Sequence, residues 1–282
     1  MNRRAAMTID VEDWFHILNS SAAPVLGDWA GQESRLAGCL EKILEILGRH
    51  RTPATFFWLG WAAEQHPGLV RLCRDSGHEI ACHGYAHLLP YAVGRVPFRD
   101  DLRRGKAVLE EIIGREVRGF RAAGFGIKQQ TAWAFEEIRE AGFVYDSSVF
   151  PCRRGHGGIC GAEISPHLIE TSSGPLLEFP QSVVRIWGKR IHLFGGGYLR
   201  LTPLRILRWG VERLHRDGRP LIVYLHPRDI DPGQPRLRLR RFRRFKSYCN
   251  LATAAAKLDW LCRTQAFRTM GELAAVYSGG EM

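Results

Sequence analysis

Two histidines four residues apart and a group of acids near the N-terminus are the residues of this sequence best suited to chemistry. The histidines are His83 and His87, and the acids are Asp10, Glu12 and Asp13. On a helical turn, the i, i+4 spacing places both imidazoles on one face. Two imidazole nitrogens and one carboxylate make the protein part of a catalytic zinc site, which keeps one position open for water. The spacing is not that of HExxH, so the helical metalloprotease motif is absent.

The three acids can fill two roles in such a site. One carboxylate can bind the metal, and a second, free carboxylate beside it can take a proton from the attacking water. Asp10 and Glu12 point to the same side if the strand continues, because side chains alternate along a strand. Asp13 reaches that side only if the chain bends, and it could instead cap the following turn.

Three further residues could take part in the chemistry. His226 follows the apolar run 221–225 and could protonate a leaving amine, or it could be an ordinary residue at the rim of a sheet. Arg121 could orient a carboxylate through a bidentate contact, and Asp146 is one candidate partner. The alternative for Arg121 is an ion pair of purely structural role, and the alternative for Asp146 is a turn over 146–148.

Strands and helices alternate along the chain, which could bring these residues together. Helical periodicity over 36–47, 102–112 and 204–214 separates short β-rich runs. The predicted strands are 5–9, 54–59, 79–83, 117–121, 143–146, 176–179, 221–225 and 267–270. This order predicts an α/β fold with parallel strands and crossover helices, most economically a closed or nearly closed barrel. Such folds carry working residues at the carboxyl ends of strands, which is where five of these runs end in a titratable or cationic group.

The composition is that of an ordinary globular protein. The 282 residues are 45% hydrophobic and 24% charged, which excludes disordered and fibrous classes. No linker divides the chain, so we expect a single domain over 1–282, with a loop insertion at about 150–175 over the barrel mouth.

Cysteine usage and hydropathy bear on the location of the protein. The seven cysteines are odd in number and include no CxxC pair, which favours a reducing compartment. The longest apolar run is far short of the ~18 residues of a membrane helix, and no segment has the pattern of a secretory leader. We therefore expect a cytoplasmic protein, which could be peripheral to the inner membrane.

The net charge of +11 is concentrated near the C-terminus. The segment Arg236–Lys246 holds seven Lys and Arg residues and no acid. Apolar residues recur from Phe242 and Phe245 onward at helical spacing, which predicts a basic helix at about 236–262 with one side packed on the core. Its charged side would be a docking surface for an anionic glycan, a lipid pyrophosphate or an acidic membrane, and no specific nucleic acid is expected.

Taken in order, the motifs resemble the polysaccharide deacetylase family (carbohydrate esterase family four). They are Thr-Ile-Asp-Val-Glu-Asp-Trp at 8–14, Glu-Ile-Ala-Cys-His-Gly-Tyr-Ala-His at 79–87, Gly-Phe-Arg-Ala-Ala-Gly-Phe at 119–125, Tyr-Asp-Ser-Ser-Val-Phe-Pro at 145–151 and Tyr-Leu-His-Pro-Arg-Asp at 224–229. Phe-Gly-Gly-Gly-Tyr-Leu-Arg at 194–200 and Pro-Arg at 235–236 are similar to the branch associated with exosortase and exopolysaccharide loci. The resemblance implies a distorted, TIM-like (β/α)7–8 barrel and metal-dependent removal of the acetyl group from an N-acetylated sugar.

The resemblance also implies a role for each motif residue. Asp10 would be the general base, oriented by Arg121, and His226 would be the general acid. His83 and His87 would bind a divalent metal, with Zn²⁺ as first choice and Co²⁺, Mn²⁺, Ni²⁺ or Fe²⁺ as alternatives. Family members with two adjacent aspartates use the second one for the metal. Here Val11 intervenes, so Glu12 is the first choice for the carboxylate ligand and Asp13 the second.

Substrate contacts are expected from aromatic side chains and from one backbone group. An open groove lined by Trp14, Trp187 or Tyr198 would favour a glycan, whereas a closed pocket would favour a small substrate. The backbone N–H near Gly124 could donate a hydrogen bond to an oxyanion.

Two residues depart from the family pattern. Ala123 stands where the family usually has proline, so the loop lacks that stiffening residue. Cys82 stands where small hydroxyl residues are common, and its thiol could compete for the metal.

We therefore predict a hydrolase that removes N-acetyl groups from a hexosamine-containing polysaccharide or oligosaccharide, as in exopolysaccharide modification. One alternative keeps the barrel and cleaves a small-molecule amide. The other is a non-catalytic protein that binds anionic glycans through the arginine-rich segment and holds no metal.

Overall fold

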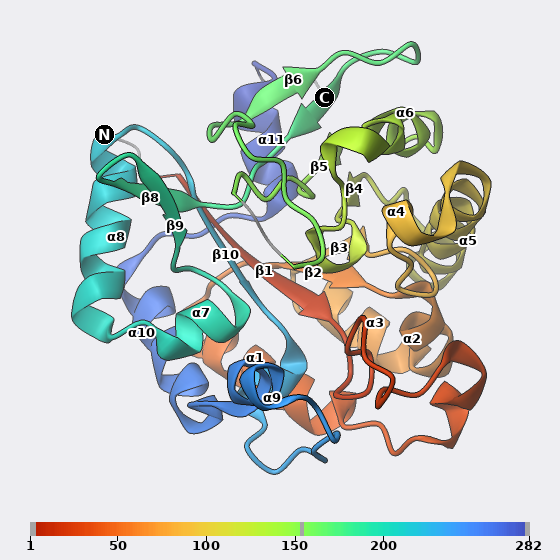
Figure 1. The fold of residues 1–282 in the computed structure, drawn as a ribbon, viewed down its shortest axis with the longest axis horizontal. Helices are drawn as coiled ribbons and strands as arrows, with labels where there is room; N and C mark the ends of the chain where they lie inside the picture. Colours follow the sequence, from red (N-terminus) through yellow and green to blue (C-terminus); the bar gives the residue numbers. More distant parts are fainter. Residues whose placement is uncertain (1–3, 153–154, 280–282) are drawn as a thin grey trace.

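A curled sheet of eight strands forms the centre of the molecule, with helices packed around it (Figure 1). The computed structural model describes residues 4–152 and 155–279. The strand order is β10-β1-β2-β3-β4-β5-β7-β6, and neighbours from β10 to β7 are parallel, whereas β6 is antiparallel to β7. This arrangement confirms the predicted distorted (β/α) barrel.

Most strands are short, and β1 is the longest strand of the sheet. The sheet consists of β1 (Ala5–Val11), β2 (Thr55–Trp58), β3 (Glu79–Cys82), β4 (Gly119–Phe120), β5 (Tyr145–Asp146), β6 (His167–Ile169), β7 (Leu176–Glu178) and β10 (Leu221–Leu225). A separate hairpin is formed by β8 (Val183–Ile186) and β9 (Lys189–His192).

Helices follow most of the parallel strands, as the periodicity over 36–47, 102–112 and 204–214 predicts. They are α1 (Leu36–Arg49), α2 (Gly60–Gln65), α3 (Pro67–Asp75), α4 (Pro90–Val93), α5 (Arg95–Ile113), α6 (Trp133–Glu140), α7 (Gly196–Leu201), α8 (Leu204–Arg216), α9 (Arg241–Tyr248), α10 (Ala254–Thr264) and α11 (Met270–Tyr277). Of the helices in the described part of the chain, none has both the length and the apolar character needed to cross a membrane.

The side chains of β1 alternate between two environments, and this alternation positions the site. Met7 and Ile9 belong to the large core shared with the helices, whereas Ala6 belongs to a smaller cluster on the inner side of the sheet. Because side chains alternate with a period of two, Thr8 and Asp10 lie on the same inner side as Ala6. The sheet thus turns Asp10 toward the interior of the barrel at its carboxyl edge.

The structure differs from the predicted strands at three places, one of which is the β8–β9 hairpin, where no strand was predicted. The run 267–270 forms a single bridge, between Arg268 and Ala6, and then continues into α11. The predicted loop insertion at 150–175 contains β6, which adds an antiparallel strand at the edge of the sheet. β6 has only three residues, His167–Ile169, which is too short for the alternation of a strand to show in the sequence.

The single docked helix expected at about 236–262 is wrong. The chain instead forms α9 and α10, separated by Asn250 in the left-handed region with φ of 54°. The Phe242 and Phe245 side chains are 75% and 53% exposed, so they do not pack on the core as expected. Basic residues occur all around α9, which leaves it without a continuous apolar face to bury.

We expect Gly119→Ala to destabilise the protein, because Gly119 of β4 lies directly against the Tyr145 ring. A Cβ at this position would be 2.0 Å from Tyr145 Cζ, so the ring or the strand must move. Overpacking of this kind costs about 1–3 kcal/mol. Urea unfolding should show the loss in the free energy of unfolding. Gly38→Ala on α1 is the control, since no atom lies within 4 Å of its Cβ position. An equal unfolding free energy for Gly119→Ala and wild type would contradict this packing.

Candidate active site

Glu12, His83 and His87 form a buried cluster at the carboxyl edge of the sheet. Glu12 follows β1, and the two histidines lie in the turn after β3. Glu12 Oε1 is 3.3 Å from His83 Nε2 and 3.0 Å from His87 Nε2. The three ligand atoms lie within 4.8 Å of one another, and all three residues are buried.

The chemistry of this donor set fits a divalent metal ion. Ligand atoms bound at 2.0–2.1 Å to a tetrahedral ion lie about 3.3 Å apart, close to the two distances from Glu12 Oε1 to the histidine nitrogens. His83 Nδ1 is 2.7 Å from the Arg121 carbonyl oxygen, to which it donates, so its Nε2 is the nitrogen that faces Glu12. A second hydrogen bond of this kind fixes the tautomer of a metal-binding histidine. His87 Nε2 is likewise buried and faces the same carboxylate oxygen, Glu12 Oε1.

The histidines stabilise the ionised form of Glu12. Burial opposes its ionisation, but the charges of His87 and His226 and hydrogen bonds from His83 and His87 hold the pKa of Glu12 well below its usual value. Burial likewise disfavours charged His83, but the hydrogen bond to Glu12 and the charge of Asp10 raise the pKa of His83.

Arg121 holds Asp10 inside the barrel. The Arg121 side chain is fully buried, and its Nη1 donates to Asp10 Oδ1 at 2.6 Å and to Thr8 Oγ1 at 2.7 Å. Nη2 donates to Ser147 Oγ at 3.1 Å, and the guanidinium carbon is 4.1 Å from the centre of the Phe57 ring. Arg121 therefore orients Asp10, through one nitrogen rather than the bidentate contact considered from the sequence.

Asp146 is not the partner of Arg121. It is paired in register with Glu178 of β7, and its Oδ1 accepts a hydrogen bond from Ser148 Oγ at 2.6 Å. Burial raises the pKa of both carboxyl groups, and the neighbouring charge of Asp146 raises that of Glu178 further, to well above its usual value. The pKa of Glu178 is thus raised more strongly than that of Asp146. The sequence gives no sign of this pairing, because it depends on which strands become neighbours.

His226 follows β10, and its ring is held by Asp229, which in turn forms an ion pair with Arg200. Its Nδ1 donates to Asp229 Oδ2 at 2.9 Å, and Asp229 Oδ1 is 3.1 Å from Arg200 Nε. The other nitrogen, Nε2, is 3.7 Å from Glu12 Oε1. Burial opposes ionisation of Asp229, but His226, Arg200 and Arg228 together lower the pKa of Asp229. Arg228 Nη2 also lies 3.4 Å from Glu12 Oε2.

Asp229, Arg200 and Arg228 are site residues that the sequence prediction missed. Asp229 and Arg228 could have been predicted from the sequence, because they follow His226 in the motif Tyr-Leu-His-Pro-Arg-Asp. Arg200 ends the motif Phe-Gly-Gly-Gly-Tyr-Leu-Arg at 194–200, but the motif does not reveal its partner, because Asp229 lies on a different element.

Asp13 and Trp14 lie away from the cluster. Asp13 accepts hydrogen bonds from the backbone N–H groups of Trp14 and Arg35, at 2.8 and 3.0 Å, which is the capping role considered from the sequence. The Trp14 indole donates to the Glu33 carbonyl oxygen at 3.0 Å and packs in an aromatic cluster with Phe15 and Trp29. Trp14 is therefore part of the wall behind the site and does not line the cavity found there.

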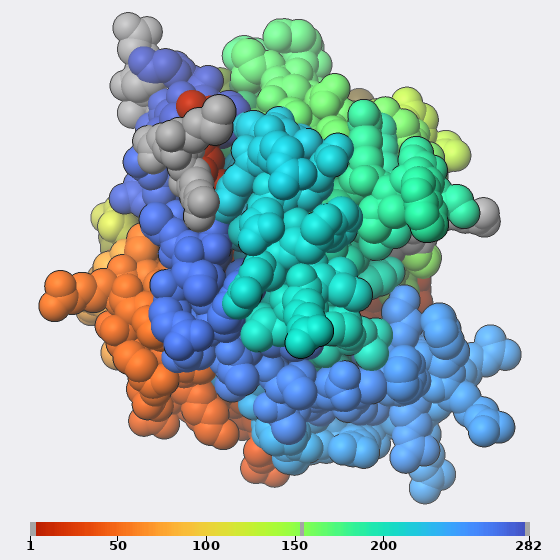
Figure 2. All heavy atoms as spheres, turned by 90° about the vertical axis from the view of Figure 1, so that its left-hand side faces the viewer, coloured from red at the N-terminus to blue at the C-terminus, as the bar shows by residue number. Residues whose placement is uncertain are grey.

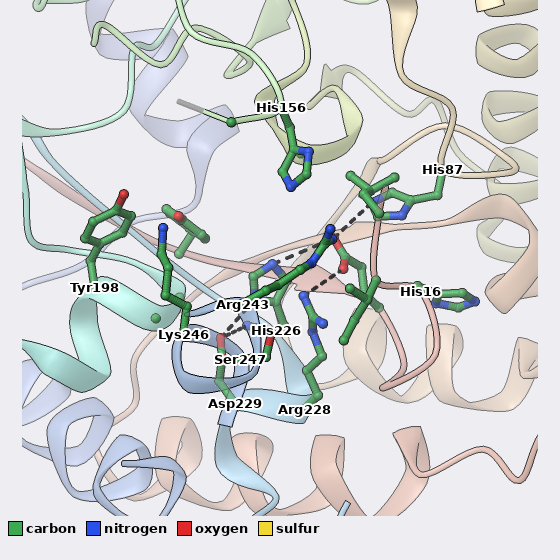
Figure 3. Close-up of a pocket in the computed structure, with 18 of the residues that line it drawn as sticks. His16, His87, His156, Tyr198, His226, Arg228, Asp229, Arg243, Lys246 and Ser247 are labelled. Carbon is green, nitrogen blue, oxygen red and sulfur yellow. Dashed lines mark hydrogen bonds and ion pairs between the residues drawn. The ribbon is translucent and has the colours of Figure 1, made fainter. Parts of the chain in front are cut away.

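A cavity of 290 Å³ opens beside Glu12 and His87 (Figure 3). Gly124, Tyr198 and His226 line it, as do Gly155 and His156 of the loop insertion. Its other lining residues are Glu12, His16, Ile17, Leu18, His87, Gly196, Gly197, Tyr224, Arg228, Asp229, Phe242, Arg243, Lys246 and Ser247. Tyr198 is thus the one member of the predicted aromatic set that lines this cavity, and Trp187 is 98% exposed on the β8–β9 hairpin.

The two departures from the family pattern have clear positions. Cys82 belongs to the large core on the helix side of the sheet, opposite the cluster, and burial raises the pKa of its thiol. Ala123 is buried at the start of a 3₁₀ turn in which Gly124 has φ of +58°. A Cβ on Gly124 would lie 2.6 Å from Leu18 Cδ1, the movable end of a side chain, so the positive φ is the main reason for glycine there.

Comparison with known families confirms the resemblance read from the motifs. Residues 32–145 match the family Polysaccharide deacetylase, and residues 147–275 match a family described as Domain of unknown function (DUF3473). A peptidoglycan-N-acetylglucosamine deacetylase from Bacillus cereus is 32% identical over 97 residues, which are 34% of this chain and 35% of that protein. The chain thus spans about a third of the length of the curated relatives it matches first.

Solved structures extend the likeness of fold to the whole chain. A protein assigned as a polysaccharide deacetylase from Mycobacterium smegmatis aligns with a TM-score of 0.65 and 20% identity, over 99% of this chain and 92% of that one. An allantoinase aligns with a TM-score of 0.64 and 15% identity, over 99% of this chain and 91% of that one. At these identities the likeness establishes the fold, and the substrate must be inferred from the residues of the site.

We expect Glu178→Gln to make the protein relatively more stable as the pH rises. A carboxyl group with a raised pKa in the folded state stabilises the fold at low pH, and this contribution is lost as the pH rises from the unfolded value of about 4.3 toward the folded value. The side-chain amide of Gln does not titrate, so its contribution to stability does not change over this pH range. The free energy of unfolding of Glu178→Gln relative to wild type should therefore increase by up to about 1.4 kcal/mol per pH unit in this window.

Urea unfolding at a series of pH values would measure this trend. Exposed Glu111 on α5 provides the control, and Glu111→Gln should show no such trend. A difference between Glu178→Gln and wild type that stays constant with pH would contradict the raised pKa of Glu178.

Proposed function

We propose that this chain, which resembles the polysaccharide deacetylase family, is a metal-dependent hydrolase that removes acetyl groups from the nitrogen of hexosamine residues in a glycan. The observation that carries the proposal is that three groups converge at one edge of the sheet. These groups are the Glu12–His83–His87 cluster, the Asp10–Arg121 ion pair and the His226–Asp229 pair. Together they provide the metal ligands, the base and the acid that amide hydrolysis needs.

Glu12, His83 and His87 would hold the metal, with Zn²⁺ as the first choice. A divalent ion there would polarise the acetamide carbonyl and lower the pKa of a water molecule to about 7. The hydrogen bond from His83 Nδ1 to the Arg121 carbonyl keeps the ring oriented, with Nε2 toward Glu12. Asp13 is the weaker choice as a ligand, because its carboxylate is already occupied by two backbone N–H groups.

Asp10 and His226 move the protons in this proposal. Asp10 accepts the proton of the attacking water, and Arg121 holds its carboxylate in place. His226 donates a proton from Nε2 to the nitrogen of the sugar as the carbon–nitrogen bond breaks, so that acetate and a free amine are the products. The hydrogen bond from Nδ1 to Asp229 supports this role, because it orients the ring and stabilises the protonated imidazole.

The residues around the cavity suggest how a glycan would be held. Tyr198 offers an aromatic ring for a sugar face, and we assign the Gly124 N–H as the donor to the developing oxyanion. The similarity of 194–200 to the exosortase-associated branch supports an exopolysaccharide as the glycan. Phe242, Arg243 and Lys246 of α9 line the same cavity, which supports contact between the segment Arg236–Lys246 and an anionic partner.

We expect His83→Ala to remove both the metal and the activity. Loss of one ligand should reduce bound zinc, measured by elemental analysis, and lower acetate release from chitooligosaccharides by at least about 100-fold. His50→Ala is the matched control, because His50 pairs with Asp259 at a distance from the cavity. Full activity of His83→Ala, with metal retained, would overturn the proposal.

We expect Asp10→Asn to separate the base from the metal ligands. The variant should keep its zinc, whereas acetate release should fall by about 10²–10⁴-fold, the usual contribution of a general base. Asn keeps the shape of the side chain and can still accept a hydrogen bond from Arg121. Loss of zinc from a folded Asp10→Asn protein would show instead that Asp10 is a ligand.

A further inference from the structure

The wall of the cavity nearest α9 is cationic. Arg228, Arg243 and Lys246 all line the cavity, and in Figure 3 their side chains are grouped between Tyr198 and His87. Arg228 comes from the turn after β10, whereas Arg243 and Lys246 are one helical turn apart on α9. Residues three apart on a helix lie on the same face, so α9 presents both cations to the same space.

These cations are poorly neutralised by the protein. Arg228 shares Glu12 with three histidines, and its Nε is buried without a hydrogen-bond partner in the described structure. Arg243 donates to the carbonyl oxygen of Asn19, which is neutral. The Lys246 ammonium is 5.3 Å from the centre of the Tyr198 ring and 5.4 Å from that of Phe242. Within the residues that the structure describes, neither Arg243 nor Lys246 forms an ion pair with a carboxylate.

The acids around the cavity do not supply the missing charge. Asp229 is committed to His226 and Arg200, and Glu12 to the histidine cluster. Burial and the nearby charge of Arg228 lower the pKa of Arg243, and both guanidinium groups line the same cavity. Like charges held together beside a cavity favour an anion that can accept hydrogen bonds from both.

The position of α9 is built into the fold. None of its residues is buried, so the hydrophobic effect does little to hold it there. Arg200 instead donates to the carbonyl oxygens of Lys246, Ser247 and Cys249 at the C-terminal end of the helix. The same Arg200 binds Asp229, so one buried guanidinium places both the His226 pair and the cationic helix.

We infer that the cavity binds a glycan with an anionic group next to the N-acetylated sugar, and that Arg243 and Lys246 bind this group. The inference rests on the proposed function and specifies its substrate class. The anion is a carboxylate or a phosphate, because both accept two charge-assisted hydrogen bonds in the geometry that arginine offers. A uronic acid neighbour and a sugar phosphate are the two sources of this chemistry.

A membrane surface is less consistent with these positions. The outward charges Arg241 and Arg244 do not line the cavity, and the light-blue segment around them protrudes from the molecule in Figure 2. A flat anionic surface would use these outward charges, whereas a substrate anion would use Arg243 and Lys246. Both pairs belong to α9, but only Arg243 and Lys246 line the cavity, so each pair can be substituted while the other is kept.

The test compares the paired variants Arg243→Gln/Lys246→Gln and Arg241→Gln/Arg244→Gln in the zinc-loaded Asp10→Asn protein. Calorimetry would measure binding of an oligosaccharide in which N-acetylglucosamine alternates with glucuronic acid, and of the same oligosaccharide with its carboxyls methylated. We expect the acid to bind at least about tenfold more tightly than the ester, because the uncharged ester cannot accept a charge-assisted hydrogen bond. The variant Arg243→Gln/Lys246→Gln should lose this preference for the acid, and the variant Arg241→Gln/Arg244→Gln should keep it. N-acetylglucosamine 1-phosphate, compared with its unphosphorylated sugar, tests the phosphate source.

The possible outcomes separate the inference from the proposed function. Equal binding of acid and ester, and of phosphate and neutral sugar, would overturn the inference. It would also be overturned if Arg241→Gln/Arg244→Gln weakened binding of the acidic oligosaccharide as much as Arg243→Gln/Lys246→Gln did. A third contrary outcome is that acid and ester bind equally and only Arg241→Gln/Arg244→Gln weakens binding to vesicles of anionic phospholipid. In the active protein, acetate release from a neutral chitooligosaccharide at the same kcat/KM as from the acid would overturn the inference but support the proposed function. Tight binding of the acid with no acetate release from either substrate would support the anion site and overturn the proposed function.

Discussion

The burial of one carboxylate, that of Glu12, is the constraint around which this edge of the barrel is organised. An ionised carboxylate is costly to remove from water unless cations and hydrogen bonds replace its hydration. Glu12 is only 3% exposed, and basic side chains from two separate strand ends meet it. His83 and His87 come from the turn after β3, and His226 and Arg228 from the turn after β10. Parallel pairing of β10, β1, β2 and β3 is what brings these turns to one edge.

The part of the site that could be predicted from the sequence depends on this parallel arrangement. Once strands and helices alternate, the carboxyl ends of the strands must share an edge, so Asp10, His83 and His226 could be placed together without knowing their contacts. Alternation along β1 also favours Glu12 over Asp13. Val11 belongs to the core on the helix side, and the chain then turns so that the Glu12 N–H donates to the Asp10 carbonyl oxygen.

The part that could not be predicted depends on tertiary partners. Arg121 binds Asp10 rather than Asp146, because Thr8 and Asp10 lie on the inner side of the sheet and β7 brings Glu178 beside Asp146. β4 and β5 have two residues each, too few for periodicity to give register. The length of the basic helix depends on Arg200, which lies 49 residues before Cys249 and binds the carbonyl groups at the end of α9. Helical spacing beyond Tyr248 therefore does not imply one continuous helix.

The charges that make up the net charge of +11 differ in effect according to their position in this structure. Charges spread over a surface are screened within about 8–10 Å at physiological salt, so they contribute mainly to encounter. Charges that line a cavity act at shorter range and with less water between them, which makes their effect stronger and more selective. Arg243 and Lys246 belong to the second kind and Arg241 and Arg244 to the first. Because both kinds lie on a helix held by a buried arginine that also contacts the partner of His226, the recognition of charge and the placement of the acid depend on the same side chain, Arg200.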